Sequence, residues 1–346
     1  MKFNELGRTG IKVSRICLGT MTFGEQNTEA EGHAQLDMAF DHGVNFVDTA
    51  EAYSFPASPK TQGDSEKIIG AWMKAKGNRS DVVVATKITG PSSERSHIRG
   101  GQLRFTRDQV TDAVDLSLKR LGTDYIDLYQ THWPERPANY FGKLDYKHDD
   151  GADFTPMEDQ LDALAHQVKA GKVRAIGVSN ETPWGVMKFL EIAEKTGMHR
   201  IASIQNPYNL LCRTFEIGLA EAAIREDCGL LAYSPLGFGA LTGKYMNGKL
   251  PEGSRHKLFP KFMRYFKPAG VQATQAYVAL ARVHGLNPAQ MALAFVNSKR
   301  FLTSTIIGAT TLGQLADNLA SEDMDLTEDL QGAIEEIHNE HPNPSP

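Results

Sequence analysis

A chain of 346 residues that is 41% hydrophobic and 23% charged is typical of a globular protein, and its length fits one large α/β barrel or two ordinary domains. The formal net charge of −5 argues against a general nucleic-acid binder, because such proteins carry a basic excess. The three cysteines lack metal-ligand spacing, and no apolar run approaches the ~20 residues of a membrane span. These features predict a cytoplasmic protein without disulfides or a membrane anchor.

The chain opens with a predicted β-hairpin at 1–12, followed by runs that alternate between strand-like and helix-like periodicity. The predicted strands are 16–20, 45–48, 82–87, 125–132, 173–178, 201–205, 229–234 and 303–307. The predicted helices are 29–42, 64–76, 106–121, 157–170, 184–196, 215–227, 272–284, 288–298 and 312–320. Residues 326–346 are predicted to form one more helix, to about His338, and a proline-rich tail.

Eight strands that alternate with helices favour a (β/α)8 TIM barrel over a doubly wound sheet. No low-complexity linker divides the chain, so we expect a single domain over 1–346. Three irregular stretches, 88–104, 133–156 and 237–271, exceed normal loop length, and each follows a strand. We therefore expect long βα loops at the C-terminal rim, the face on which barrel enzymes carry their active sites.

Three of the predicted strands end at or near a chemically useful side chain. Asp48 ends its strand and Tyr53 follows five residues later, while Lys87 and His132 end the next two strands. Because the ends of parallel neighbours lie at one rim, these four side chains can converge on one small volume.

The chemistry of these four groups suits proton transfer to a carbonyl. A tyrosine hydroxyl titrates near pH 10, so Tyr53 needs a cation such as the Lys87 ammonium to stabilise its phenolate form and lower its pKa. Asp48 would keep that ammonium charged in a partly dry site. His132 can position a carbonyl oxygen beside the phenol, and only a hydride source is lacking.

Other interpretations remain for these residues. Taken singly, Tyr53 fits a packing aromatic, His132 a structural histidine, and Asp48 with Lys87 a stabilising ion pair. A metal site of Asp48, Asp127 and His132 is disfavoured, because strand parity points Asp127 to the opposite face. Glu51 is expected to be solvated.

The residues also carry a family resemblance, which covers essentially the whole chain. The motifs are Leu18-Gly19-Thr20-Met21-Thr22-Phe23-Gly24, Phe46-Val47-Asp48-Thr49-Ala50 with Tyr53, Thr86-Lys87, Tyr125-Ile126-Asp127-Leu128-Tyr129 with His132, Gly171 to Asn180, Gln205-Asn206-Pro207-Tyr208, and Tyr233-Ser234-Pro235-Leu236. In this order they resemble the aldo-keto reductase superfamily, nearest to its bacterial Tas-type branch and similar to the β subunits of voltage-gated potassium channels.

The resemblance implies an NADPH-dependent reductase in which Tyr53 donates the proton to a small-molecule carbonyl substrate. Lys87 and Asp48 would tune the phenol, and His132 would orient the substrate carbonyl. The nicotinamide would transfer its hydride to the carbonyl carbon.

The resemblance also implies a set of NADPH contacts. Ser179, Asn180 and Gln205 match residues that hydrogen-bond the nicotinamide carboxamide, and Tyr233 matches the aromatic on which the nicotinamide stacks. Lys244 and Arg255 match basic residues of the channel-subunit branch and would meet phosphate charge. The other implied contacts are Thr20, Met21, Asp48, Ser234, Pro235, Leu236, Gly237, Gly308, Thr310, Gln314, Asp317 and Asn318.

Some positions depart from the family pattern or mimic other motifs. The steroid and aldose branches have a lysine and an arginine where this chain has Gly308 and Gln314. The stretch 237–244 resembles a dinucleotide fingerprint and a phosphate loop, but Phe238, Thr242 and Tyr245 stand where those motifs need other residues. The aromatic residues of the substrate loops name no substrate; they are Trp133, Tyr140, Phe141, Tyr146 and Phe154.

Two functional classes therefore stay open. The favoured one is an NADPH-dependent aldehyde or ketone reductase without a metal. The alternative is a nucleotide-sensing regulatory protein of the channel-subunit type, which holds the cofactor and turns over slowly. A monomer is favoured over a homo-oligomer, because no heptad pattern or exposed apolar face is evident.

Overall fold

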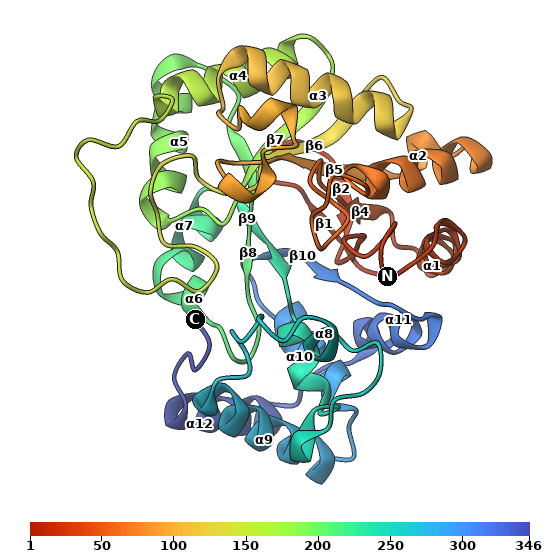
Figure 1. Cartoon of the computed structure of the whole chain (residues 1–346). Coiled ribbons are helices and arrows are strands. Elements are labelled where there is room, and N and C mark those ends of the chain that lie inside the picture. The colour runs from red at the N-terminus through yellow and green to blue at the C-terminus, as the bar shows by residue number, and fades with distance from the viewer.

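A computed structural model describes all 346 residues and contains a closed barrel of parallel strands (Figure 1). The strands follow in the order β10-β3-β4-β5-β6-β7-β8-β9. They are β3 Ile16–Gly19, β4 Phe46–Asp48, β5 Val83–Ile88, β6 Ile126–Thr131, β7 Val173–Ser179, β8 Ile201–Pro207, β9 Gly229–Tyr233 and β10 Leu302–Ile307. The predicted (β/α)8 TIM barrel is confirmed, and pairing of Ile16 with Thr305 closes it.

Helices surround the barrel on the outside (Figure 1). They are α1 Glu29–Asp41, α2 Asp64–Lys76, α3 Arg107–Leu121, α4 Met157–Lys169, α5 Pro183–Thr196, α6 Thr214–Gly218, α7 Ala220–Arg225, α9 Pro268–Val283, α10 Pro288–Asn297, α11 Leu312–Leu319 and α12 Glu328–Glu340. Five of them begin after a threonine whose hydroxyl accepts a backbone N–H: Thr28, Thr106, Thr182, Thr311 and Thr327. This capping satisfies donors that the first helical turn leaves unpaired.

Alternation along the strands separates the barrel interior from the layer beneath the helices. In β5, Val83 and Ala85 pack in an inner apolar cluster with side chains from all the other barrel strands, whereas Val84 packs in the outer cluster under the helices. Because side chains alternate between the two faces, Lys87 points inward like Ala85. In β4, Phe46 is inward and Val47 outward, so Asp48 also points inward.

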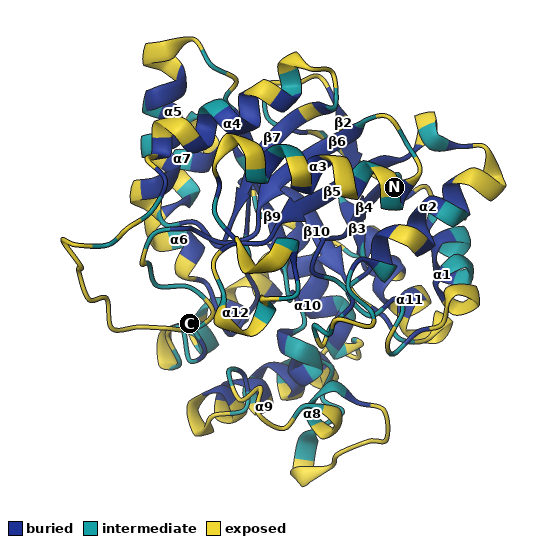
Figure 2. Ribbon diagram, turned by 45° about the horizontal axis from the view of Figure 1, so that its top comes forward, coloured by how far each residue is buried: buried dark blue, intermediate teal, exposed yellow.

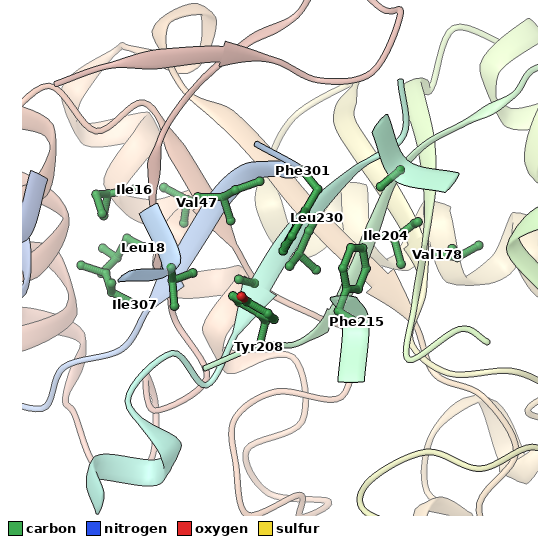
Figure 3. Packing of buried hydrophobic residues seen from close by; sticks show 14 of the residues in the cluster. Ile16, Leu18, Val47, Val178, Ile204, Tyr208, Phe215, Leu230, Phe301 and Ile307 are labelled. Atoms are coloured by element: carbon green, nitrogen blue, oxygen red, sulfur yellow. The ribbon is translucent and has the colours of Figure 1, made fainter. Parts of the chain in front are cut away.

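The outer layer is a continuous apolar core between strands and helices. Burial is concentrated on the barrel and on the inner faces of the helices, while the outer helix faces are exposed (Figure 2). Figure 3 shows one region of this core, where Tyr208 and Phe215 both pack near Phe301. The ring centroids of Tyr208 and Phe215 lie 5.3 and 5.2 Å from that of Phe301.

The N-terminal hairpin closes the bottom of the barrel. Its strands are β1 Phe3–Glu5 and β2 Lys12–Ser14, so it extends two residues beyond the predicted end at Lys12. Leu6, Ile11 and Val13 are buried and join the inner apolar cluster of the barrel. The hairpin therefore plugs the end of the barrel that lies opposite the long loops.

Most helix ends lie within two residues of their predicted positions, including the C-terminal helix, which ends at Glu340 instead of about His338, but two helices differ more. The predicted helix 215–227 is divided into α6 and α7, because Leu219 has a φ of −121° and leaves the helical region. Helix α9 begins four residues before the predicted start, at Pro268, where proline fits the first turn.

The long segments after β5, β6 and β9 do lie at the C-terminal rim, as predicted. They contain short helical turns: η2 Ser93–Arg95, η3 Arg99–Gly101, η4 Gly237–Thr242, η5 Met246–Gly248 and α8 Arg255–Leu258. Residues 143–151 form an open, exposed loop that extends away from the barrel (Figures 1 and 2). Two further turns lie elsewhere, η1 Arg79–Asp81 and η6 Ala320–Asp323. No helix is both long and apolar enough to cross a membrane.

The crossing of α2 and α3 depends on a glycine. A Cβ atom at Gly70 would lie 2.5 Å from the carbonyl oxygen of Leu121, which is backbone and cannot swing away. Glycine is thus required here by close approach, although the position lies inside a helix.

We expect Gly70→Ala to lower the free energy of unfolding by about 2 kcal/mol, because the clash outweighs the gain of about 1 kcal/mol in helix propensity. The matched control is Gly332→Ala in α12, where a Cβ atom meets nothing within 4 Å. That variant should be slightly more stable than the wild type. Urea unfolding followed by circular dichroism measures both changes, and an equal gain for both variants would contradict the packing argument.

Candidate active site

A cavity of about 1410 Å³ opens at the C-terminal end of the barrel. Its wall includes side chains from the ends of the strands and from the three long rim loops. The volume exceeds that of a typical site for one small molecule, so a dinucleotide and a small substrate can be accommodated together.

Lys87 and Asp48 form a buried ion pair at the base of this cavity. The Lys87 Nζ lies 2.7 Å from Asp48 Oδ2 and donates a second hydrogen bond to the Thr49 carbonyl oxygen, also at 2.7 Å. Both side chains are almost fully buried. Burial acts to lower the pKa of Lys87, but the Asp48 carboxylate raises it, and the pKa of Lys87 lies above its ordinary value, so the amine stays charged.

The second oxygen of Asp48 is held by the opposite side of the barrel. Gln205, in β8, donates from Nε2 to Asp48 Oδ1 at 2.8 Å. Asp48 therefore has hydrogen-bond donors on both oxygens, as the burial of a polar group requires.

Tyr53 and His132 lie above this pair on the cavity wall. The Lys87 Nζ is 4.9 Å from the centroid of the Tyr53 ring, and the rings of Tyr53 and His132 meet edge to face with centroids 5.5 Å apart. The structure thus brings all four predicted side chains together at the ends of adjacent strands.

The pKa of Tyr53 differs from the expectation drawn from the sequence. Burial raises the pKa of Tyr53 above its ordinary value, and the Lys87 ammonium offsets only part of that rise. The phenol is therefore protonated throughout the physiological range. The expectation of a lowered pKa was wrong, because the sequence could not weigh desolvation against one nearby cation.

The His132 ring is neutral and has an unused nitrogen. Burial, together with the positive charges of Lys87 and Arg95, holds the pKa of His132 well below its usual range. Its Nδ1 is buried and has no hydrogen-bond partner. A neutral imidazole carries one N–H donor, so His132 can donate to an oxygen placed in the cavity.

Polar side chains at the ends of β7, β8 and β9 form a second part of the wall. Asn180 donates from Nδ2 to the His132 carbonyl oxygen at 2.9 Å, and its Oδ1 accepts from the Tyr233 hydroxyl at 2.6 Å. Asn180 and Ser234 both have a φ of 54°, a region that is costly for residues other than glycine. Such backbone conformations are enriched at functional sites.

Cations without acidic partners line the cavity on the loop after β9, and Lys244 and Arg255 are among them. Lys244 and Arg255 are half-buried, and neither forms an ion pair. The Arg255 guanidinium carbon lies 4.8 Å from the centroid of the Phe238 ring and 5.5 Å from that of Phe55. An anion in the cavity would find these charges unneutralised.

Most of the side chains assigned from the sequence line this cavity. They are Thr20, Met21, Asp48, Tyr53, His132, Ser179, Asn180, Gln205, Tyr233, Ser234, Pro235, Leu236, Lys244, Arg255, Gly308, Thr310, Gln314, Asp317 and Asn318. Two do not. Lys87 lies behind the wall at the ion pair, and Gly237 is buried against the Tyr265 ring.

Sequence reasoning missed a buried acid beside the site. Glu51, expected to be solvated, is 1% exposed and pairs with Arg99, with Nη2 and Oε1 3.0 Å apart. The pair connects the loop after β5 to the segment after β4. No sequence pattern near either residue predicts this contact. Asp127, by contrast, points away from the cavity as predicted and pairs with Arg79 and Arg174.

Comparisons with known proteins match this chain over nearly its whole length. The family model described as the aldo/keto reductase family matches residues 15–339. The protein named "Protein tas" of Escherichia coli is 50% identical over 100% of both chains. The L-glyceraldehyde 3-phosphate reductase of Escherichia coli is 29% identical over 92% of this chain and 87% of its own length. A protein of Schizosaccharomyces pombe named as a candidate β subunit of a voltage-gated potassium channel is 31% identical over 97% and 93%.

We expect Lys87→Met to lower the free energy of unfolding by about 3 to 5 kcal/mol, because Asp48 would be left as a buried unpaired charge. Adding Asp48→Asn to that variant removes the charge and should restore a large part of the loss. Urea unfolding of the two variants measures the difference.

The control for this prediction is Lys67→Met. Lys67 pairs with Asp64 at 2.8 Å, but its side chain is 58% exposed. Loss of an exposed pair should cost about 1 kcal/mol or less. An equal loss for Lys67→Met and Lys87→Met would contradict the special weight given to the buried pair.

Proposed function

The chain belongs to the aldo/keto reductase family, and we propose that it reduces the carbonyl group of aldehydes or ketones to an alcohol, with NADPH as cofactor and Tyr53 as proton donor. The observation that carries this proposal is a protonated, buried phenol beside an ion-paired ammonium and a neutral imidazole. The L-glyceraldehyde 3-phosphate reductase among the relatives acts, by its name, on an aldehyde, which supports testing aldehydes first.

The cavity fits a nicotinamide dinucleotide. Amide side chains of Asn180 and Gln205 suit the carboxamide of a nicotinamide, and Tyr233 offers an aromatic face beside them. The unpaired cations Lys244 and Arg255 suit its phosphates. Thr311 caps the start of α11 next to the cavity, where backbone N–H groups favour an anion.

The residues of the chain supply the acid half of the reaction. A carbonyl oxygen between Tyr53 and His132 can accept hydrogen bonds from the phenol and from the imidazole N–H. When Tyr53 gives up its proton to that oxygen, the phenolate that forms lies beside the Lys87 ammonium, which stabilises it. Asp48 keeps Lys87 charged for this purpose. When bound, NADPH supplies the hydride that adds to the carbonyl carbon.

We further propose that residues 1–346 act as one domain. The family match extends over 15–339, and Leu6, Ile11 and Val13 of the preceding hairpin belong to the barrel interior.

A nucleotide-sensing role is the alternative. It is favoured by Lys244 and Arg255, which belong to the long loop over the cavity and would slow the release of NADPH. The similarity to the relative named as a candidate channel β subunit also favours the nucleotide-sensing role. Turnover under steady-state conditions separates this role from a metabolic reductase.

Replacing Tyr53 with Phe tests the assigned acid. We expect wild-type protein to oxidise NADPH with 4-nitrobenzaldehyde, and Tyr53→Phe to lose about 100-fold or more of that activity while it binds NADPH normally. The matched control is Tyr125→Phe, since Tyr125 lies near the start of β6 with its ring against Arg79. Should Tyr53→Phe reduce the aldehyde as fast as the control, Tyr53 is not the proton donor.

Replacing Arg255 with Ala tests the choice of cofactor. We expect the Kd for NADPH to rise about tenfold or more and the Kd for NADH to change far less. The reason is that we assign Arg255 to the additional phosphate, which only NADPH carries. Fluorescence titration of both nucleotides measures the ratio, with Arg225→Ala, an exposed arginine of α7, as control. Equal weakening of both nucleotides would contradict the assignment.

A further inference from the structure

Arg95, on the rim loop after β5, lines the cavity without an acidic partner. Its Nη1 donates to Ser92 Oγ at 3.2 Å, while its Nε is buried and has no hydrogen-bond partner. No carboxylate lies within ion-pair distance of its guanidinium, in contrast to Arg99 and Arg104 of the same loop. Burial lowers the pKa of Arg95, but a guanidinium stays protonated in proteins. The side chain is therefore a charged donor with unused capacity.

The loop that carries Arg95 is held at two points. Arg99 forms its buried pair with Glu51, and Trp133 Nε1 donates to the Pro91 carbonyl oxygen at 3.1 Å. Gly90 packs so closely on Trp133 that a Cβ atom would lie 2.5 Å from its Nε1. These contacts fix the part of the loop on either side of Arg95.

This anchoring sets the Arg95 guanidinium over the Trp133 ring, which in turn contacts His132. The guanidinium carbon lies 5.1 Å from the centroid of the Trp133 ring, and that ring lies 4.8 Å from the His132 ring. Arg95, Trp133, His132 and Tyr53 all line the same cavity. A substrate whose carbonyl reaches Tyr53 and His132 would thus extend past Trp133 to Arg95.

The other buried or half-buried cations of the cavity have separate surroundings. Lys244 and Arg255 belong to the loop after β9, where phosphates of the cofactor are proposed. Arg264 donates to the Pro346 carbonyl oxygen at 3.1 Å and contacts Cys212 Sγ. Arg95 alone is next to the aromatic wall formed by Trp133.

We propose that Arg95 determines substrate specificity by binding an anionic group, a carboxylate or a phosphate, on the far end of the aldehyde. A guanidinium presents a planar fork of N–H donors that matches both groups. This inference rests on the proposed reductase function, and it names the substrate class of that site.

The test compares two substrates of nearly the same shape. 4-Carboxybenzaldehyde carries a carboxylate where 4-nitrobenzaldehyde carries a neutral nitro group. We expect the wild type to have a higher kcat/KM for the carboxylate. Arg95→Gln should lower that kcat/KM about tenfold or more through KM, with the nitro compound changed less than about twofold. Glyceraldehyde 3-phosphate against glyceraldehyde repeats the comparison for phosphate and shows which anion is preferred.

Two further variants separate a specific contact from a general charge effect. Lys147→Gln removes a charge from the exposed loop after β6, where the side chain of Lys147 is 85% exposed, and it should leave both substrates unchanged. Arg95→Lys keeps the charge without the fork, so it should restore part of the preference. A preference that is absent in the wild type, or that falls equally in Arg95→Gln and Lys147→Gln, overturns the proposal.

A binding measurement distinguishes failure of this inference from failure of the proposed function. 4-Carbamoylbenzoate and 4-nitrobenzamide have an unreactive amide in place of the aldehyde. Calorimetry in the presence of saturating NADP+ should give tighter binding of the carboxylate to the wild type and about tenfold weaker binding to Arg95→Gln. If that pattern appears while no aldehyde is reduced, the anion site stands and the reductase proposal fails. If binding does not depend on Arg95, the anion site fails whatever the turnover.

Discussion

The ion pair between Lys87 and Asp48 is the interaction on which the cavity depends. Two charges inside a barrel lose their hydration, and this cost is recovered only when further hydrogen bonds complete both groups. The Thr49 carbonyl and the Gln205 amide supply those bonds, and Gln205 comes from the far side of the barrel. The pair is therefore satisfied only in the closed barrel, so the fold and the electrostatics of the site cannot be separated.

Much of this arrangement could be predicted from the sequence, because it follows from strand periodicity. Parallel strands end at one rim, so an acid, a lysine and a histidine at the ends of three successive strands had to meet there. Parity along each strand put Asp48 and Lys87 on the inner face and turned Asp127 outward to Arg79. The eight alternating strands and helices, and the long rim loops, were predicted on the same grounds.

The sequence does not predict how burial and nearby charges combine to set a pKa, and it does not predict the contacts between loops. The rise in the pKa of Tyr53 depends on how much water the surrounding loops exclude. Glu51 looked like a surface acid until the loop after β5 brought Arg99 to it. Nothing in the sequence apart from its position on a long loop indicates that Arg95 lines the cavity. The division of the helix at Leu219 likewise has no signal in the sequence.

Closure of the barrel joins the two ends of the chain, since Ile16 of β3 pairs with Thr305 of β10. Contacts so distant in sequence form late, because the entropy of a long loop must be lost first. The hairpin residues Leu6, Ile11 and Val13 have packing partners on strands all around the barrel. During synthesis, the amino-terminal segment can therefore complete its packing only after the last strand has left the ribosome, and until then incompletely covered apolar side chains expose the nascent chain to aggregation.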